Sequence, residues 1–207
     1  MKQLYVHGLG QTSESWHKVI AHLHTQEFAV CPDLAKMVSK HEVTYQSLYA
    51  AFADICDAID EPFTICGLSL GGVLALHYAI EHPEKVHSLI LIATPYKMPK
   101  QLLRFQNAIF HLMPKRMFPS MGFEKADFLQ LCHSMMDLDF SSSLTNITCP
   151  VLVIYGAKDH ANKKTSITLA QTLKEAKILT IDDAGHEVNT EAPKQLADIL
   201  CEFYQQT

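Results

Sequence analysis

The strongest local signal in the chain is the stretch Phe63-Thr64-Ile65-Cys66-Gly67-Leu68-Ser69-Leu70-Gly71-Gly72-Val73. Phe63–Cys66 is a short apolar run typical of a buried strand, and a helix is expected from Val73 to Glu81, where His82-Pro83 ends it. Between them, Gly67-x-Ser69-x-Gly71 predicts a sharp strand-to-helix turn that raises the serine hydroxyl off a sheet. Because three of the chain's eight glycines fall in one hexapeptide, an incidental glycine-rich turn is the weaker interpretation.

Short apolar runs alternate with helix-like runs on both sides of this turn. Strands are expected at residues 3–7, 28–31, 63–66, 86–93, 151–155 and 178–181. Helices are expected at residues 15–25, 44–59, 73–81, 165–176 and 190–203. Thr44 is a suitable N-cap, and Pro193 falls in a first helical turn, where its missing N–H costs little. Such alternation predicts an α/β fold, a mainly parallel sheet with helices on both faces.

The alternation breaks at Pro95 and resumes near Ser143. This segment holds six of the eight methionines and six of the ten phenylalanines, a composition too apolar for disorder. One interpretation is a few helices packed on the core; the other is a lid whose inner face lines an apolar substrate pocket, a role that adaptable methionines suit. We therefore expect a single domain over residues 1–207, with a small helical lid insertion at about 95–143.

Composition and charge exclude several classes of protein. The chain has 207 residues and a net charge of −5, which gives neither the basic face of a nucleic-acid-binding protein nor a polybasic membrane anchor. No apolar run reaches the roughly 18–20 residues of a spanning helix. The first residues form a strand pattern rather than an export signal, so we expect a cytoplasmic protein with six reduced cysteines, and with neither a nucleic-acid nor a membrane partner.

A serine nucleophile needs a general base and a carboxylate that orients it. His186 follows the last expected strand, and Asp159 follows the strand before it, so both are expected at the same sheet edge as Ser69. The competing carboxylates Asp182 and Asp183 lie on the histidine's own short loop and reach the imidazole poorly. Asp33 is a further candidate. The chain order Ser–Asp–His is the one used by hydrolases with this type of turn.

Acyl transfer also needs donors for the oxyanion of a tetrahedral intermediate. His7-Gly8-Leu9-Gly10 ends the first expected strand, and glycines there let the backbone approach a substrate. The N–H groups of Leu9 and Leu70 are the natural pair of donors. A plain turn is the alternative for this segment. The chain has no CxxC motif, and the chemistry needs no metal or organic cofactor.

Five motifs together resemble the α/β-hydrolase superfamily, in its branch of small esterases, lactonases and related enzymes. They are His7-Gly8-Leu9-Gly10 with Trp16 after it, Gly67-Leu68-Ser69-Leu70-Gly71-Gly72, His82-Pro83-Glu84-Lys85-Val86, Tyr155-Gly156-Ala157-Lys158-Asp159 and Gly185-His186. They span almost the whole chain. The resemblance implies that the first strand lies between the second and the third, with the oxyanion loop and Ser69 flanking a topological switch point.

The chain departs from that family pattern in two places. The hairpin that usually precedes the His-Gly strand is absent, so the resemblance implies a minimal sheet of about six strands. In place of a glycine-rich Asp-x-x-Gly stretch, the chain has Pro32-Asp33-Leu34-Ala35-Lys36-Met37. A serine at position 69 argues against the dehalogenase and epoxide hydrolase relatives, which use aspartate there.

Three functions remain in competition at this point. The first is hydrolysis of a small-to-medium, apolar carboxylic ester by Ser69, His186 and Asp159. The second keeps these residues for thioester hydrolysis or carbon–carbon bond cleavage, with Arg104, Lys115 and Arg116 as candidate contacts for an acidic substrate. The third is a ligand-binding protein without turnover on the same scaffold. The expected partner is a small molecule in each case, and the sequence does not determine the oligomeric state.

Overall fold

The computed structural model describes residues 1–38 and 42–207, with side chains except at residues 101–106. Within this part of the chain, the sheet consists of β1 (Gln3–Val6), β2 (Ala29–Val30), β3 (Phe63–Leu68), β4 (Val86–Ile92), β5 (Val151–Gly156) and β6 (Ala176–Ile181). The strand order is β2-β1-β3-β4-β5-β6, and every neighbouring pair is parallel. The predicted α/β fold with a six-stranded sheet is confirmed, as is the place of the first strand between the second and the third.

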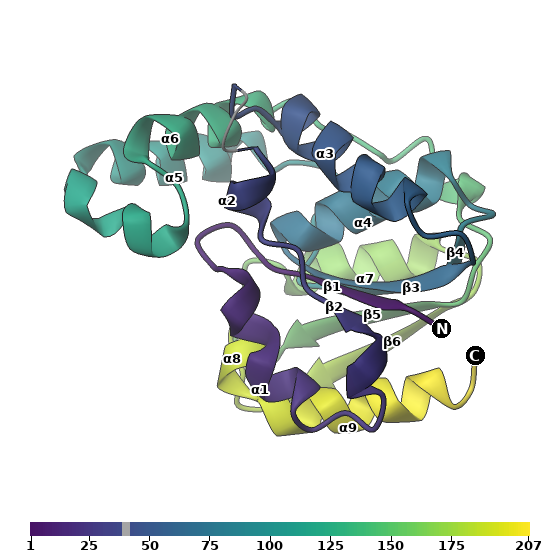
Figure 1. Cartoon of the computed structure of the whole chain (residues 1–207). Helices are drawn as coiled ribbons and strands as arrows, with labels where there is room; N and C mark the ends of the chain where they lie inside the picture. The colour runs from purple at the N-terminus through teal and green to yellow at the C-terminus, as the bar shows by residue number, and fades with distance from the viewer. Residues whose placement is uncertain (39–41) are drawn as a thin grey trace.

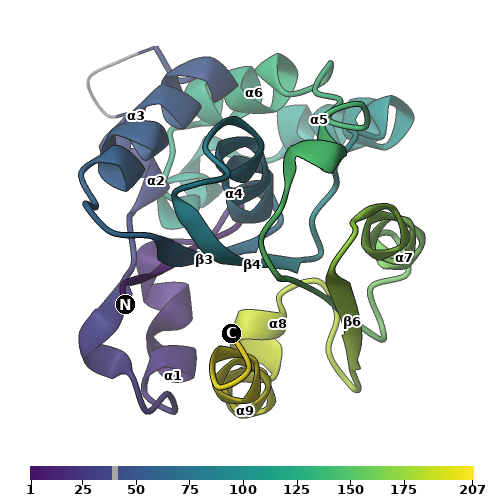
Figure 2. The same cartoon turned by 90° about the vertical axis from the view of Figure 1, so that its right-hand side faces the viewer.

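Helices cover both faces of the sheet (Figure 1). In chain order they are α1 (His17–Ile20), α2 (Leu34–Met37), α3 (Tyr45–Asp57), α4 (Leu70–Glu81), α5 (Lys100–Leu112), α6 (Lys125–Ser134), α7 (Lys163–Thr172), α8 (Val188–Glu191) and α9 (Pro193–Tyr204). Figure 2 shows α3 and α4 on one side of the strands and α1 and α9 together on the other. None of the helices in the described residues is long and apolar enough to cross a membrane.

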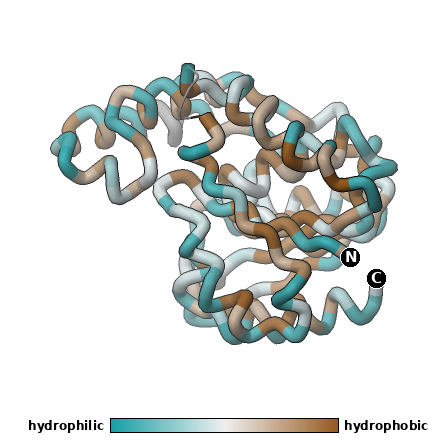
Figure 3. The backbone as a smooth tube through the Cα atoms, viewed as in Figure 1, coloured by the Kyte–Doolittle hydropathy of each residue, from teal (hydrophilic) through white to brown (hydrophobic). Residues whose placement is uncertain are grey.

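Alternate side chains of the strands enter two separate cores. Leu89 and Leu91 of β4 pack in the core under α3 and α4, whereas Ile90 and Ile92 pack in the core with α1 and α9. Successive side chains of a strand point to opposite faces of the sheet, which gives this alternation. Because helices cover both faces of the sheet, the sequence of β4 is apolar at almost every position. The brown, hydrophobic segments in Figure 3 gather along the central strands for the same reason.

The first and the last helix differ from the sequence-based expectation. The first ends at Ile20 rather than near residue 25, and the Gln26 side-chain amide donates to the carbonyls of Ala21 and Leu23 beyond that end, both at 3.1 Å. The last is divided into α8 and α9, with Ala192 between them in a non-helical conformation. Pro193 opens α9, since proline suits the first helical position but cannot continue the preceding helix.

The strand-to-helix turn around Ser69 has the strained backbone that its glycines predict. Ser69 adopts φ 51° and ψ −113°, which is rare for a residue with a side chain. A Cβ at Gly67 would lie 2.4 Å from the carbonyl oxygen of Gly71. A Cβ at Gly71 would lie 2.2 Å from the carbonyl oxygen of Val6. The helix therefore crosses β1 closely, and it begins at Leu70 rather than Val73 because Val73 N–H already bonds to Ser69 O at 2.9 Å.

Gly71→Ala is expected to destabilise the fold by about 3 kcal/mol, the upper part of the overpacking range. The added methyl group would meet the backbone of β1, which cannot move without disturbing the sheet. Urea unfolding measures the loss. Gly185→Ala is the matched control, since the nearest atoms to its Cβ are the carboxylate oxygens of Glu191 at 3.3 Å, a side-chain contact that has to yield by only a few tenths of an ångström. Equal losses in both variants would contradict this account of the turn.

The segment between β4 and β5 holds α5, α6 and the short 3₁₀ helices η3 (Lys115–Met117), η4 (Pro119–Met121) and η5 (Leu144–Asn146). The strands β5 and β6 point toward the side from which α5 and α6 extend (Figure 1). The segment contacts the loop after β1, since a Cβ at Gly10 would lie 3.5 Å from Met121 Cε. The insertion therefore lies at the carboxyl edge of the sheet, where β1 and β3 also end.

Candidate active site

Ser69 stands between the end of β3 and the first residue of α4. Its backbone N–H bonds to Ile92 O of β4 at 2.8 Å, which fixes the turn to the neighbouring strand. The residue is partly accessible. The hydrogen bonds of the described residues leave the N–H groups of Leu9 and Leu70 without an acceptor. Neither predicted oxyanion donor is therefore engaged by another group among the described residues.

His186 and Asp159 are brought together by loops that cross at the ends of β5 and β6. A Cβ at Gly156 would lie 2.2 Å from Gly185 O, so only glycine lets the histidine loop pass over β5 so closely. Lys158 N–H bonds to Ala184 O at 2.9 Å and joins the two loops. As a result, His186 Nδ1 lies 2.8 Å from Asp159 Oδ2. Asp159 is 6% exposed, while the His186 side chain is 42% exposed.

The environment of Asp159 favours its ionised form. Burial acts to raise its pKa, but the hydrogen bonds with His186 and Asn162 outweigh burial and hold the pKa below its usual value. The Asn162 amide donates to both carboxylate oxygens, at 3.0 and 2.8 Å. The Asn162 backbone N–H donates to Asp159 Oδ1 at 3.2 Å. The sequence analysis missed Asn162, which lies in the turn just before α7 (Lys163–Thr172), where an Asp side chain often accepts from a nearby backbone N–H.

The competing carboxylates are occupied elsewhere. Asp183 is exposed and pairs with Lys158 at 3.2 Å. Asp33 caps α2 by accepting from the Lys36 N–H at 3.3 Å. Asp182 is exposed on the loop after β6. Asp159 is thus the candidate that meets the imidazole. Among the hydrogen bonds of the described residues, none joins the Ser69 hydroxyl to His186, so the structure pairs the base with the carboxylate and leaves the nucleophile unbonded.

The loop after β1 is held against the Ser69 turn by His7. A Cβ at Gly8 would lie 3.5 Å from Ser69 Cβ, so the two loops are in contact. His7 Nε2 accepts from Leu34 N–H at 3.1 Å, which places the ring proton on Nδ1, where Gly8 O accepts it at 2.9 Å. Burial lowers the pKa of His7. The neutral ring therefore ties α2 to the loop that presents the Leu9 N–H.

A buried pair of amides links this loop to the helix after His186. Gln11 Nε2 donates to Asn189 Oδ1 at 3.1 Å, and Asn189 Nδ2 donates back to Gln11 Oε1 at 3.2 Å. Gln11 Oε1 also accepts from Gly8 N–H at 3.3 Å. Both side chains are more than nine-tenths buried. The pair fixes the position of the oxyanion loop relative to the histidine loop, and sequence spacing gave no sign of it.

Glu191 is a second residue that the sequence analysis missed. Its carboxylate accepts from Gly185 N–H at 2.7 Å and from Glu187 N–H at 3.1 Å, the residues on either side of His186. We expect Glu191→Ala to lower kcat/KM by about 10- to 100-fold, since a shift of about 1 Å at a reacting group can cost that much. The kcat/KM of Glu191→Gln should fall between those of the wild type and Glu191→Ala, because glutamine retains one acceptor oxygen.

Glu202→Ala is the matched control for Glu191→Ala. Glu202 is exposed on α9, and its side chain accepts only a 3.4 Å bond from Gln206 among the described residues. The kcat/KM of this variant, measured by steady-state kinetics, should therefore stay within twofold of the wild-type value. If Glu191→Ala behaved like Glu202→Ala, the carboxylate would have no part in placing His186.

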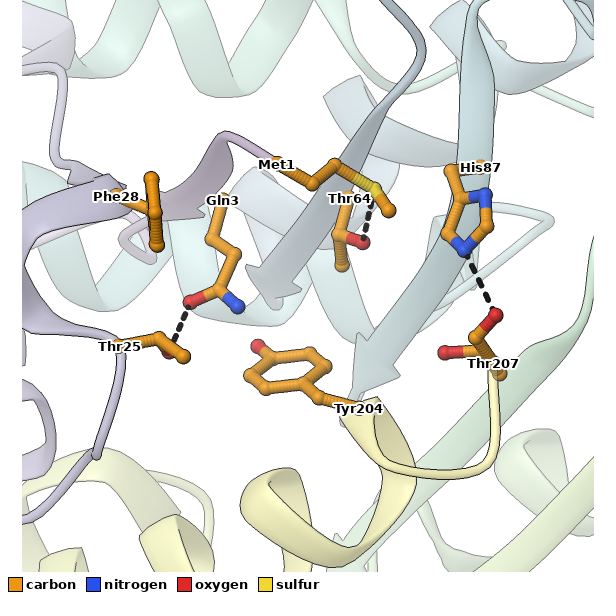
Figure 4. Close-up of a pocket in the computed structure, with 8 residues that line it drawn as sticks. All are labelled: Met1, Gln3, Thr25, Phe28, Thr64, His87, Tyr204 and Thr207. Atoms are coloured by element: carbon orange, nitrogen blue, oxygen red, sulfur yellow. Dashed lines mark hydrogen bonds between the residues drawn. The ribbon is translucent and has the colours of Figure 1, made fainter.

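A cavity of about 170 Å³ lies at the opposite end of the strands (Figure 4). Gln3, Thr64 and His87 line it, near the first residues of β1, β3 and β4. Ser69 comes five residues after Thr64, roughly 17 Å along a strand. This cavity is therefore separate from the candidate active site.

The parallel sheet, the strained Ser69 turn and the histidine–carboxylate pair at the strand ends define a class, the α/β hydrolases. A family model described as the alpha/beta hydrolase family matches residues 3–199, and the chain belongs to this family. Pimeloyl-[acyl-carrier protein] methyl ester esterase of Aeromonas hydrophila is 25% identical over 237 residues, covering 96% of this chain and 93% of that protein.

Two further similarities bear on the family. The 3-oxoadipate enol-lactonase 2 of Acinetobacter baylyi is 26% identical over 227 residues, covering 92% of this chain and 84% of that protein. The structure of MenH from S. aureus superposes with a TM-score of 0.82 at 16% identity, covering 99% of this chain and 94% of that one. The last similarity concerns the fold alone.

Proposed function

We propose that this α/β hydrolase cleaves small-to-medium, apolar carboxylic esters through an acyl-enzyme on Ser69. The observation that carries the proposal is the Asp159–His186 pair, 2.8 Å apart, at the same sheet edge as a serine with positive φ. The named activities of the relatives support the reaction class, since both an esterase and an enol-lactonase cleave ester bonds.

In the proposed mechanism, Ser69 Oγ attacks the ester carbonyl carbon while His186 Nε2 takes the hydroxyl proton. The N–H groups of Leu9 and Leu70 bind the oxyanion, aided by the dipole of α4, a helix of twelve residues. The intermediate collapses, and the alcohol leaves with the proton held by His186. Water then attacks the acyl carbon and loses a proton to His186. The bond between the acyl carbon and Ser69 Oγ breaks, His186 gives the proton to Ser69 Oγ, and the acid departs. Asp159 holds the imidazole with its proton on Nδ1 throughout.

The insertion at about residues 95–143 is proposed as a lid over this cleft. Its η4 segment lies against the oxyanion loop, since a Cβ at Gly122 would be 3.7 Å from Gln11 O and 3.3 Å from Ala35 Cβ. Phe118, Phe123 and Met98 of the insertion are buried in the core, so the apolar lining is proposed to come from Met121, which lies beside the loop after β1. An apolar lining favours uncharged acyl groups, because a carboxylate there would lose its hydration.

The test is hydrolysis of p-nitrophenyl acetate, butyrate, octanoate and dodecanoate, with the p-nitrophenyl monoester of a dicarboxylic acid as a charged partner for octanoate. We expect kcat/KM to peak at butyrate or octanoate and to fall at least tenfold for the charged ester of equal length. Turnover only of thioesters, or cleavage of carbon–carbon bonds in an acidic substrate, would contradict the proposal. Ligand retention without any turnover would indicate a binding protein instead.

A further inference from the structure

Three large apolar side chains are exposed on one part of the insertion. Ile109 is 44% exposed, Leu112 86% and Met117 46%. Ile109 and Leu112 lie at the end of α5, and Met117 lies on η3. We call residues 107–117 the insertion tip. Exposed apolar groups gathered in this way cost solubility and usually mark a surface that binds something.

The tip is not an unfinished part of the core. Phe118 and Phe128 are buried and pack edge to face with ring centroids 5.3 Å apart. Lys125 Nζ binds the carbonyls of His111 and Met113, at 2.6 and 2.7 Å, and so holds the end of α5. Both rings belong to the core under α3 and α4, and the three exposed side chains remain outside it.

Two basic side chains lie within the tip itself. Residues 107–117 contain Lys115 and Arg116 and no Asp or Glu, in a chain of net charge −5. Lys97 pairs with Asp139 at 2.7 Å and Lys100 with Asp137 at 2.5 Å. Lys115 and Arg116 are exposed, and among the described residues neither has a carboxylate partner. The tip therefore presents two cations without a carboxylate partner beside its exposed apolar groups.

We propose that the insertion tip docks the protein on an anionic lipid surface. Leu112, Ile109 and Met117 would enter the boundary between headgroups and acyl chains, while Lys115 and Arg116 bind lipid phosphates. Since α5 and α6 extend beyond the carboxyl edge of the sheet (Figure 1), docking turns the Ser69 edge toward the lipid. The whole-chain charge led to the expectation of no membrane partner, because averaging hid this local basic and apolar segment.

The test is co-sedimentation of the Ser69→Ala protein, which cannot hydrolyse lipid through the proposed nucleophile, with vesicles of phosphatidylglycerol and phosphatidylcholine or of phosphatidylcholine alone. We expect binding to the anionic vesicles only, weakened by salt. Leu112→Asp should weaken it about 10- to 100-fold. The double variant K115E/R116E should weaken it at least about 25-fold, near fivefold for each cation removed.

Matched controls are Leu179→Asp, an exposed leucine on the edge strand β6, and K174E/K177E, two exposed lysines near the start of β6, at the opposite edge of the sheet. Both should bind vesicles like the parent, with unchanged circular dichroism. Absence of vesicle binding, or equal loss in tip and control variants, would overturn the inference. The inference would also be overturned if the tip variants changed only the oligomeric state measured by light scattering, or changed only the binding of an acidic protein. Serine labelling and ester turnover in the wild type test the proposed function separately.

Discussion

Ser69→Ala is expected to lower kcat/KM for a p-nitrophenyl ester by about 10⁴- to 10⁶-fold. Loss of the hydroxyl removes the only atom that is proposed to form the acyl-enzyme, so the residual rate would come from the oxyanion donors and from binding. A fluorophosphonate probe should label the wild type and leave the variant unlabelled. Steady-state kinetics and intact-protein mass spectrometry check the two results.

Folding of Ser69→Ala should be unaffected. The serine side chain makes no hydrogen bond among the described residues, and alanine meets the same strain at φ 51°. Urea unfolding should therefore agree with the wild type to within about 0.5 kcal/mol. Ser142→Ala is the matched control, an exposed serine far along the chain, and it should keep full activity and labelling. An active Ser69→Ala protein would refute the nucleophile.

Asp159→Asn is expected to lower kcat by about 10⁴-fold, as loss of the orienting carboxylate does in serine hydrolases. An amide can donate to the imidazole Nδ1, which stabilises the tautomer whose Nε2 carries the proton and so cannot act as base. Because the hydrogen bonds with His186 and Asn162 lower the pKa of Asp159 from its usual value, they favour the ionised carboxylate in the wild type between pH 6 and pH 9. The defect should therefore be of similar size across that range.

Asp183→Asn tests the competing assignment with the same chemical change. Asp183 has φ 63°, a conformation that asparagine tolerates, and its carboxylate faces Lys158 rather than the histidine. We expect this variant to remain within twofold of the wild type in kcat and kcat/KM. A larger loss in Asp183→Asn or Asp33→Asn than in Asp159→Asn would transfer the orienting role to that residue.

Local patterns in the sequence were enough for the fold. The apolar runs and Gly67-x-Ser69-x-Gly71 predicted the strands and the strained turn, because strand periodicity and the steric demands of glycine act over a few residues. Helix ends were less predictable. The first helix stops at Ile20, and beyond it the Gln26 side-chain amide donates to the carbonyls of Ala21 and Leu23, bonds that no periodicity encodes.

The sequence by itself determined the residue types, their order along the chain and their common place at the carboxyl ends of parallel strands. Only the tertiary structure decided which carboxylate meets His186, because that choice depends on how two loops cross over Gly156. It also decided that Asn162, Glu191 and the Gln11–Asn189 pair support the site. These contacts depend on directions in space between side chains and loops, and a linear pattern does not carry such directions.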